Sequence, residues 1–84
     1  MQRAMFMFIR EGVLLQTISI YDIDEANQQL IFVATEKSDM NSLESDLIHY
    51  SNTYKADFIN VLNDKEFESY LSETYGYQIW EDLF

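Results

Sequence analysis

The chain has 84 residues, no Cys, 48% hydrophobic residues and a formal net charge of -10. Its length suits one domain over residues 1–84, and its apolar fraction supports a core without disulfides or a bound metal. The missing Cys excludes disulfides and thiolate catalysis, and the negative charge disfavours direct binding to nucleic acid or to an anionic membrane. With no signal-peptide pattern at the N-terminus, we expect a cytoplasmic protein.

The N-terminal half predicts three β-strands joined by short connections. Residues 3–10 are nearly all apolar and bounded by charges, and Gly12 marks the turn that follows them. Residues 13–21 are the candidate for a second strand, because residues 17–21 alternate and contain β-branched side chains. The polar residues 22–28 connect this strand to a third, apolar strand over residues 29–35.

The stretch from residue 41 to residue 62 predicts helical structure. Six side chains recur at steps of four and three residues, which places them on one face of a helix. They are Leu43, Leu47, Tyr50, Tyr54, Phe58 and Val61. Two interpretations are open: one helix over residues 41–62, or two helices broken near residues 51–53, where Ser, Asn and Thr favour caps and turns.

A further helix is predicted to begin after Asn63. Asn63 can cap it, and Glu66 three residues later completes a pattern that resembles a capping box. Gly76 is suited to the left-handed position that ends a helix. Residues 77–84 then predict either a short terminal helix or an additional strand.

Together these elements predict an α+β fold. We expect a three-stranded antiparallel β-meander followed by two or three α-helices that pack on one face of the sheet. The continuous apolar runs of the first and third strands indicate apolar surface on the far side of the sheet as well. That surface would be covered by the C-terminal tail or by a second subunit.

The sequence contains no pattern that predicts a catalytic, cofactor or metal site. A calcium loop starting at Asp22 would need Gly at its sixth position and Glu at its twelfth, and the chain has Asn27 and Val33 there. His49 is the only His, and a single His without Cys makes a zinc site improbable. No nucleophile motif accompanies it. We therefore expect neither an enzyme nor a cofactor.

Charge is the most informative property of the C-terminal part. Residues 38–84 hold ten acids and two bases, an excess of eight negative charges. A basic protein surface is the natural partner for such a chain. Duplex DNA carries one negative charge per ~1.7 Å of its axis, and carboxylates along helices can imitate part of that field.

This charge leads to the hypothesis of an inhibitor that occupies the basic nucleic-acid-binding surface of a target protein. In size and charge it would be comparable to the DNA mimics with which phages and mobile elements block restriction or CRISPR nucleases. The acidic candidates for partner binding are Glu44, Asp46, Asp57, Asp64, Glu66, Glu68 and Glu73, with Glu81 and Asp82 in the tail. The aromatic candidates are Tyr75, Tyr77 and Trp80, because Tyr and Trp dominate interface hot spots.

Alternative hypotheses remain open. The chain could be an immunity-type or adaptor protein that binds a basic partner without imitating nucleic acid. It could also be a homodimeric structural domain that pairs through an apolar face. In a blander interpretation the acidity serves only solubility, and the aromatic candidates belong to the core.

Overall fold

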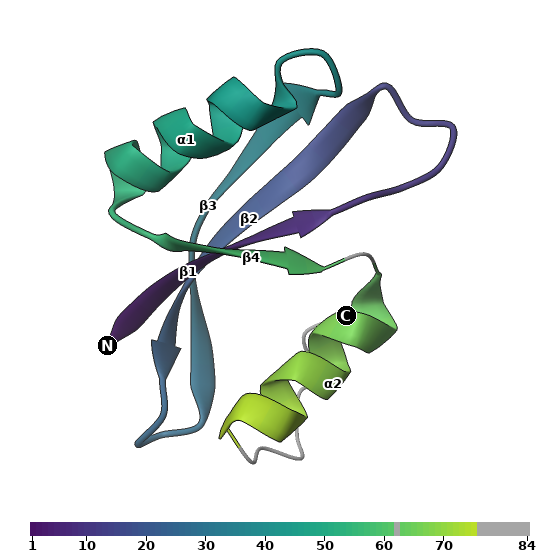
Figure 1. The fold of residues 1–84 in the computed structure, drawn as a ribbon. Coiled ribbons are helices and arrows are strands. Elements are labelled where there is room, and N and C mark those ends of the chain that lie inside the picture. Colours follow the sequence, from purple (N-terminus) through teal and green to yellow (C-terminus); the bar gives the residue numbers. More distant parts are fainter. Residues whose placement is uncertain (62, 76–84) are drawn as a thin grey trace.

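In the computed structural model, a four-stranded mixed sheet lies between two helices (Figure 1). The structure describes residues 1–61 and 63–75. The strands lie in the order β3-β2-β1-β4, so β1 and β2 are interior and β3 and β4 form the edges. Along the chain the elements are β1 (Gln2–Phe8), β2 (Leu15–Asp24), β3 (Gln29–Asp39), α1 (Leu43–Tyr54), β4 (Asp57–Val61) and α2 (Asp64–Tyr75).

The predicted α+β class and the antiparallel meander of β1, β2 and β3 are confirmed. Met5 on β1 faces Ile20 on β2, and β2 pairs antiparallel with β3 in turn. Gly12 in the first connection has a φ of 73°, as a turn glycine should. β2 and β3 are longer than predicted and continue to Asp24 and Asp39, because their ladder extends through residues that are too polar to be recognised by hydropathy alone.

The prediction that the helical stretch continues to residue 62 is wrong. Residues 57–61 form β4, which pairs parallel with β1 and sets Phe58 beside Met5 and Ile59 beside Phe6. β1 has an edge that β2 does not cover, and its backbone groups there need hydrogen-bond partners. A segment of aromatic and β-branched residues satisfies them, and this requirement outweighs the helical spacing.

The chain leaves α1 at Lys55, just beyond the break that the sequence suggested. Lys55 adopts the left-handed conformation, with φ 55° and ψ 51°. The N–H of Ala56 donates to the Ser51 carbonyl at 3.1 Å, and the Ser51 hydroxyl donates to the Ala56 carbonyl at 2.8 Å. These bonds satisfy groups at the helix end and turn the chain into β4.

The two helices cover opposite faces of the sheet, whereas the sequence predicted one face for both. On one face, Ala4, Phe6 and Phe8 of β1 pack with Phe67 and Leu71 of α2. On the other face, Met5 and neighbouring β2 side chains pack against α1 through Leu43, Leu47, Tyr50 and Tyr54. β1 is therefore buried on both sides, which explains why its sequence is apolar without alternation.

The packing of α2 makes a first prediction about stability. Phe67 is buried, and its ring centroid lies 4.5 Å from that of Phe6 and 5.3 Å from that of Phe8. Phe67→Ala should lower the free energy of unfolding by about 3–5 kcal/mol, because it leaves a cavity under α2. Phe32→Ala is the control: Phe32 is 60% exposed on β3, and its loss should cost under about 1 kcal/mol. Urea unfolding measures both, and equal losses would contradict this account of the core.

A second prediction concerns the end of α1. A side chain in the left-handed conformation costs roughly 1 kcal/mol, and glycine removes this cost but loses more entropy on folding. Lys55→Gly should therefore raise the free energy of unfolding by about 0.5 kcal/mol. Ser45→Gly inside α1 should lower it by a similar amount. Thermal unfolding of the two variants tests this contrast, and a loss of stability in Lys55→Gly would count against the assigned helix end.

Candidate partner-binding surface

α2 begins where the sequence predicts. Asn63 Oδ1 accepts a hydrogen bond from the Glu66 N–H at 2.9 Å, so Asn63 caps the helix. Phe67 and Leu71 direct one side of the helix into the core. The other sides face solvent, and the acids of the first turn suit the positive end of the helix dipole.

The exposed sides of α2 carry four of the nine acids that the sequence singled out. Asp64 and Glu68 lie four residues apart and share one side of the helix, and the same geometry brings together Glu66 and Glu73, seven residues apart. Lys65 lies between the two pairs. All four acids are exposed. We call Asp64, Glu66, Glu68 and Glu73 the α2 acidic surface.

One side of the α2 acidic surface borders an open depression. Its volume is about 470 Å³. Two acids, Glu66 and Glu73, and the half-buried Tyr70 line it. Its lining residues are Asn63, Lys65, Glu66, Ser69, Tyr70 and Glu73. A depression with carboxylates beside an aromatic ring suits the cationic side chains of a protein partner.

The acids of α1 do not join this surface, because α1 covers the opposite face of the sheet. Glu44 is exposed. Asp46 is used inside the protein: its Oδ2 accepts hydrogen bonds from the hydroxyls of Ser38 at 2.6 Å and Ser42 at 3.0 Å. These bonds hold the pKa of Asp46 below its ordinary value. Asp46 therefore fastens α1 to β3.

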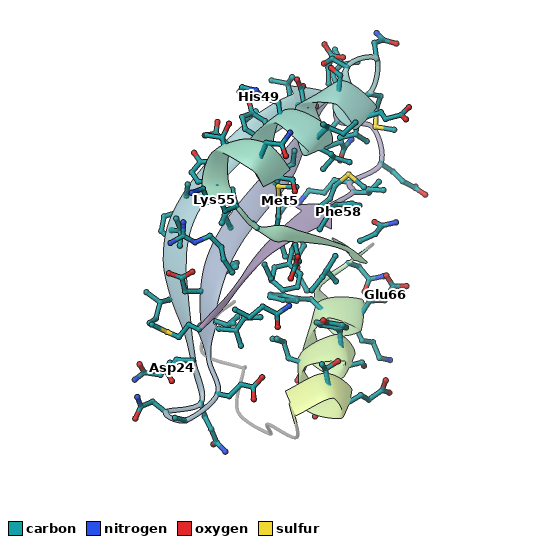
Figure 2. All side chains as sticks on the ribbon, turned by 60° about the vertical axis from the view of Figure 1, so that its left-hand side comes forward. Met5, Asp24, His49, Lys55, Phe58 and Glu66 are labelled. Atoms are coloured by element: carbon teal, nitrogen blue, oxygen red, sulfur yellow. The ribbon has the colours of Figure 1, made fainter. Side chains whose placement is uncertain are left out.

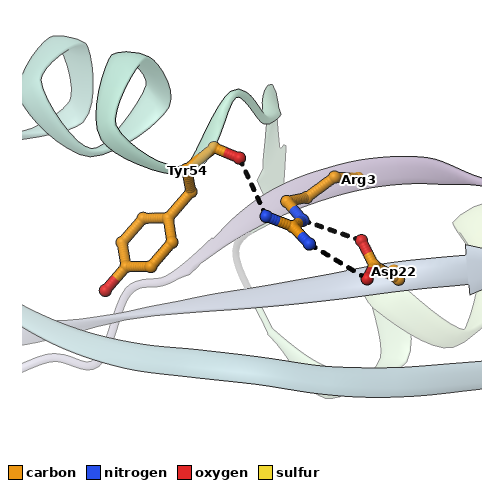
Figure 3. Close-up of polar contacts among 3 residues, drawn as sticks. All are labelled: Arg3, Asp22 and Tyr54. Carbon is orange, nitrogen blue, oxygen red and sulfur yellow. Dashed lines mark hydrogen bonds and ion pairs between the residues drawn. The ribbon is translucent and has the colours of Figure 1, made fainter.

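Two further polar contacts hold α1 on the sheet. Arg3 on β1 donates from Nε and Nη2 to the Asp22 carboxylate at 2.8 and 3.2 Å, and from Nη1 to the Tyr54 carbonyl at 3.1 Å (Figure 3). The Arg3 guanidinium lowers the pKa of Asp22. Tyr54 also donates its hydroxyl to Glu36 on β3, which raises the pKa of Tyr54. These groups join elements of the fold, so we assign them no part in partner binding.

The remaining sequence candidates are scattered. Asp57 is exposed at the start of β4 and accepts a hydrogen bond from Gln2 Nε2 at 3.3 Å. Tyr75 ends α2, and its side chain lies outside the described part of the structure. Also outside the described residues are Tyr77, Trp80, Glu81 and Asp82.

Sequence reasoning missed a hollow beside β4. Its volume is about 210 Å³. Phe58, labelled in Figure 2, is 41% exposed on β4, and Ile48 on α1 is 60% exposed, so apolar side chains of both elements meet solvent at this hollow. The hollow is lined by Leu47, Ile48, Ser51, Asn52 and Phe58. The signal in the sequence was Ile48, an apolar residue outside the α1 stripe, but its neighbour Phe58 was assigned to a helix.

The structure suggests no chemistry for the single histidine. His49 is exposed on α1, with its ring centroid 5.2 Å from that of Tyr50. Within residues 1–61 and 63–75, no three His, Asp or Glu side chains lie close enough together to hold a metal ion. Neither of the two described helices is long and apolar enough to cross a membrane.

Comparison of the chain with protein-family models, curated proteins and solved structures finds no match. The candidate surface is therefore argued from its own geometry and charge.

The contacts of Asp46 predict how stability depends on pH. Its pKa is depressed in the folded state, so its contribution is present above the unfolded-state value of about 3.9 and is lost as pH falls through the lower folded-state value. Asp46→Asn should therefore destabilise the protein at pH 7 and flatten the loss of stability below about pH 4. Glu44→Gln, two residues earlier on α1 and exposed, should leave that pH profile unchanged. Urea midpoints from pH 2 to pH 7 measure both, and identical profiles would refute a structural role for Asp46.

Proposed function

We propose that this protein is a small acidic binding protein that occupies the basic nucleic-acid-binding surface of a target protein and blocks it, in the manner of a DNA mimic. The observation that supports this function best is the α2 acidic surface. Its four exposed carboxylates lie within ten consecutive residues, with Lys65 as the single base among them.

The charge on α2 is dense along the helix axis but is divided between two sides. Asp64 and Glu73 are nine residues apart, which is roughly 13.5 Å along the axis, so the four carboxylates project to about one per 4.5 Å. One strand of duplex DNA carries one charge per ~3.4 Å. Asp64 and Glu68 lie on one side of the helix and Glu66 and Glu73 on another, so a basic groove must contact both sides of α2 to meet all four.

Several other acids have structural roles, which leaves fewer acids as candidates for partner binding. Asp46, Asp22 and Glu36 each accept hydrogen bonds that hold the fold together. In contrast, no ion pair within the described residues involves Asp64, Glu68 or Glu73. Carboxylates without such a role are suited to contact a partner, and charge of this kind promotes fast association.

A matched pair of charge-reversal variants tests the proposal. Glu68→Lys/Glu73→Lys alters the α2 acidic surface, and Glu11→Lys/Glu25→Lys makes the same change in net charge on two exposed connections. Tagged wild type and both variants are used to capture proteins from the host lysate. Each captured protein is then purified, and its binding is measured with and without a labelled duplex oligonucleotide.

We expect wild type and the control variant to bind a nucleic-acid-binding protein and to compete with the duplex. The α2 variant should bind at least about tenfold more weakly, because reversing contact charges costs 1.4 kcal/mol or more. If both variants lose affinity equally, net charge alone is responsible and the α2 acidic surface is not the site. Binding that the duplex does not affect would reject mimicry and favour a partner neutralised in another way.

A further inference from the structure

β4 forms one edge of the sheet within the described residues. It pairs with β1 on one side, and no other strand of the described residues pairs with it on the other. Alternate N–H and C=O groups along such an edge point away from the sheet and can pair with a further extended chain. β4 connects α1 to α2 along the chain (Figure 1).

The two edges of the sheet differ in how they are protected. β3 has an irregularity in its register opposite Ile20 and Tyr21, and its exposed residues include Lys37 and Asp39. Bulges and charges of this kind oppose the addition of a strand. β4 pairs with β1 in an unbroken register and has one charged residue, Asp57. Of the two edges, β4 is the better suited to accept another strand.

The two faces beside β4 differ in chemistry. Phe58 pairs with Met5 and belongs to the α1 face, where Ile48 and the 210 Å³ hollow lie. Asp57 pairs with Ala4 and belongs to the α2 face, and Asp64 follows the far end of the strand. Side chains of an added strand alternate between these faces. Apolar side chains would meet Phe58 and Ile48, and side chains on the other face would meet the Asp57 carboxylate at the start of the strand and Ile59 at its middle.

We infer that β4 accepts an extended segment of a basic protein partner as a fifth strand, with apolar side chains on the α1 face and Lys or Arg on the α2 face. This inference rests on the proposed function, because it names how the same acidic partner-binding region engages its target. Charge favours a basic partner over a second copy of the chain. A second copy would bring another net charge of -10 and would be repelled. A segment with alternating basic residues is attracted by the negative charge of this protein.

Synthetic heptapeptides provide the test, measured with the full chain by fluorescence polarisation. The first peptide alternates Lys and Val. The second has the same composition with its Lys and Val residues in separate blocks. Two further peptides carry N-methyl groups on alternate backbone amides, one set on each edge of the strand, so charge is kept while one edge loses its donors.

We expect the alternating peptide to bind and the block peptide to bind at least about tenfold more weakly. One N-methylated peptide should lose binding and the other should retain it, because only one edge faces β4. Ile48→Ala/Phe58→Ala should weaken binding about tenfold. Phe32→Ala, which changes an exposed ring on the opposite edge, should have no effect. Bound peptide should also slow hydrogen exchange of the β4 amides.

Several results would overturn the inference. These are equal affinity for the alternating and block peptides, equal effects of the two N-methylated peptides, or no binding at millimolar peptide. Slow exchange of all β4 amides in the free monomer would show that the edge is already occupied without a partner. If the β4 amides exchange slowly only in samples whose measured mass is that of a dimer, the strand that occupies the edge belongs to a second copy. None of these results affects the charge-reversal test of the α2 acidic surface. The experiments therefore distinguish a wrong inference about β4 from a wrong proposal about the α2 acidic surface.

Discussion

The constraint on which this structure depends is the burial of β1 on both faces. Its central residues are apolar without interruption, and Ala4, Met5 and Phe6 are fully buried. A strand of this kind needs hydrogen-bond partners on both edges and apolar cover on both faces. β2 and β4 pair with the two edges of β1, and α1 and α2 cover its two faces. β4 and α2, the last two elements within the described residues, thus supply an edge partner and apolar cover for the first strand.

This arrangement separates acids that accept hydrogen bonds within the fold from the exposed acids of α2. On the side of α1, carboxylates hold the fold together: Asp46 binds two hydroxyls, Asp22 binds Arg3, and Glu36 binds Tyr54. On α2, apolar packing through Phe67 and Leu71 attaches the helix, and its acids remain exposed. A high negative charge alone says little about function. Its concentration on a helix that does not need it for packing is the stronger argument for recognition.

The proposed acidic surface and the β4 edge belong to one region of the molecule. β4 leads directly into α2, so the carboxylates of α2 begin where the open strand ends. Charge gives rapid but weakly selective association, whereas backbone pairing and an apolar hollow select for shape and sequence. A binder that uses both would reach a basic target quickly and dissociate slowly. This combination also suits a protein of 84 residues, whose surface is small.

The sequence alone determined the local features. Hydropathy predicted the three meander strands, the side-chain chemistry of Asn63 predicted the start of α2, and helical spacing predicted the apolar side of α1 from Leu43 to Tyr54. These features depend on interactions within a few residues or on one pattern of period two or 3.6. The acids of α2 could be assigned to one helix from the sequence, because the helix itself was predicted from such local features.

Tertiary structure alone decided the rest. Phe58 has helical spacing from α1, yet it belongs to a strand because β1, some fifty residues earlier, has an open edge. The opposite placement of the helices follows from both faces of β1 needing cover, which no local pattern expresses. It also removes Glu44 and Asp46 from the α2 acidic surface and creates the hollow beside β4. Which residues share a surface depends on contacts between distant segments, and one sequence read locally does not contain them.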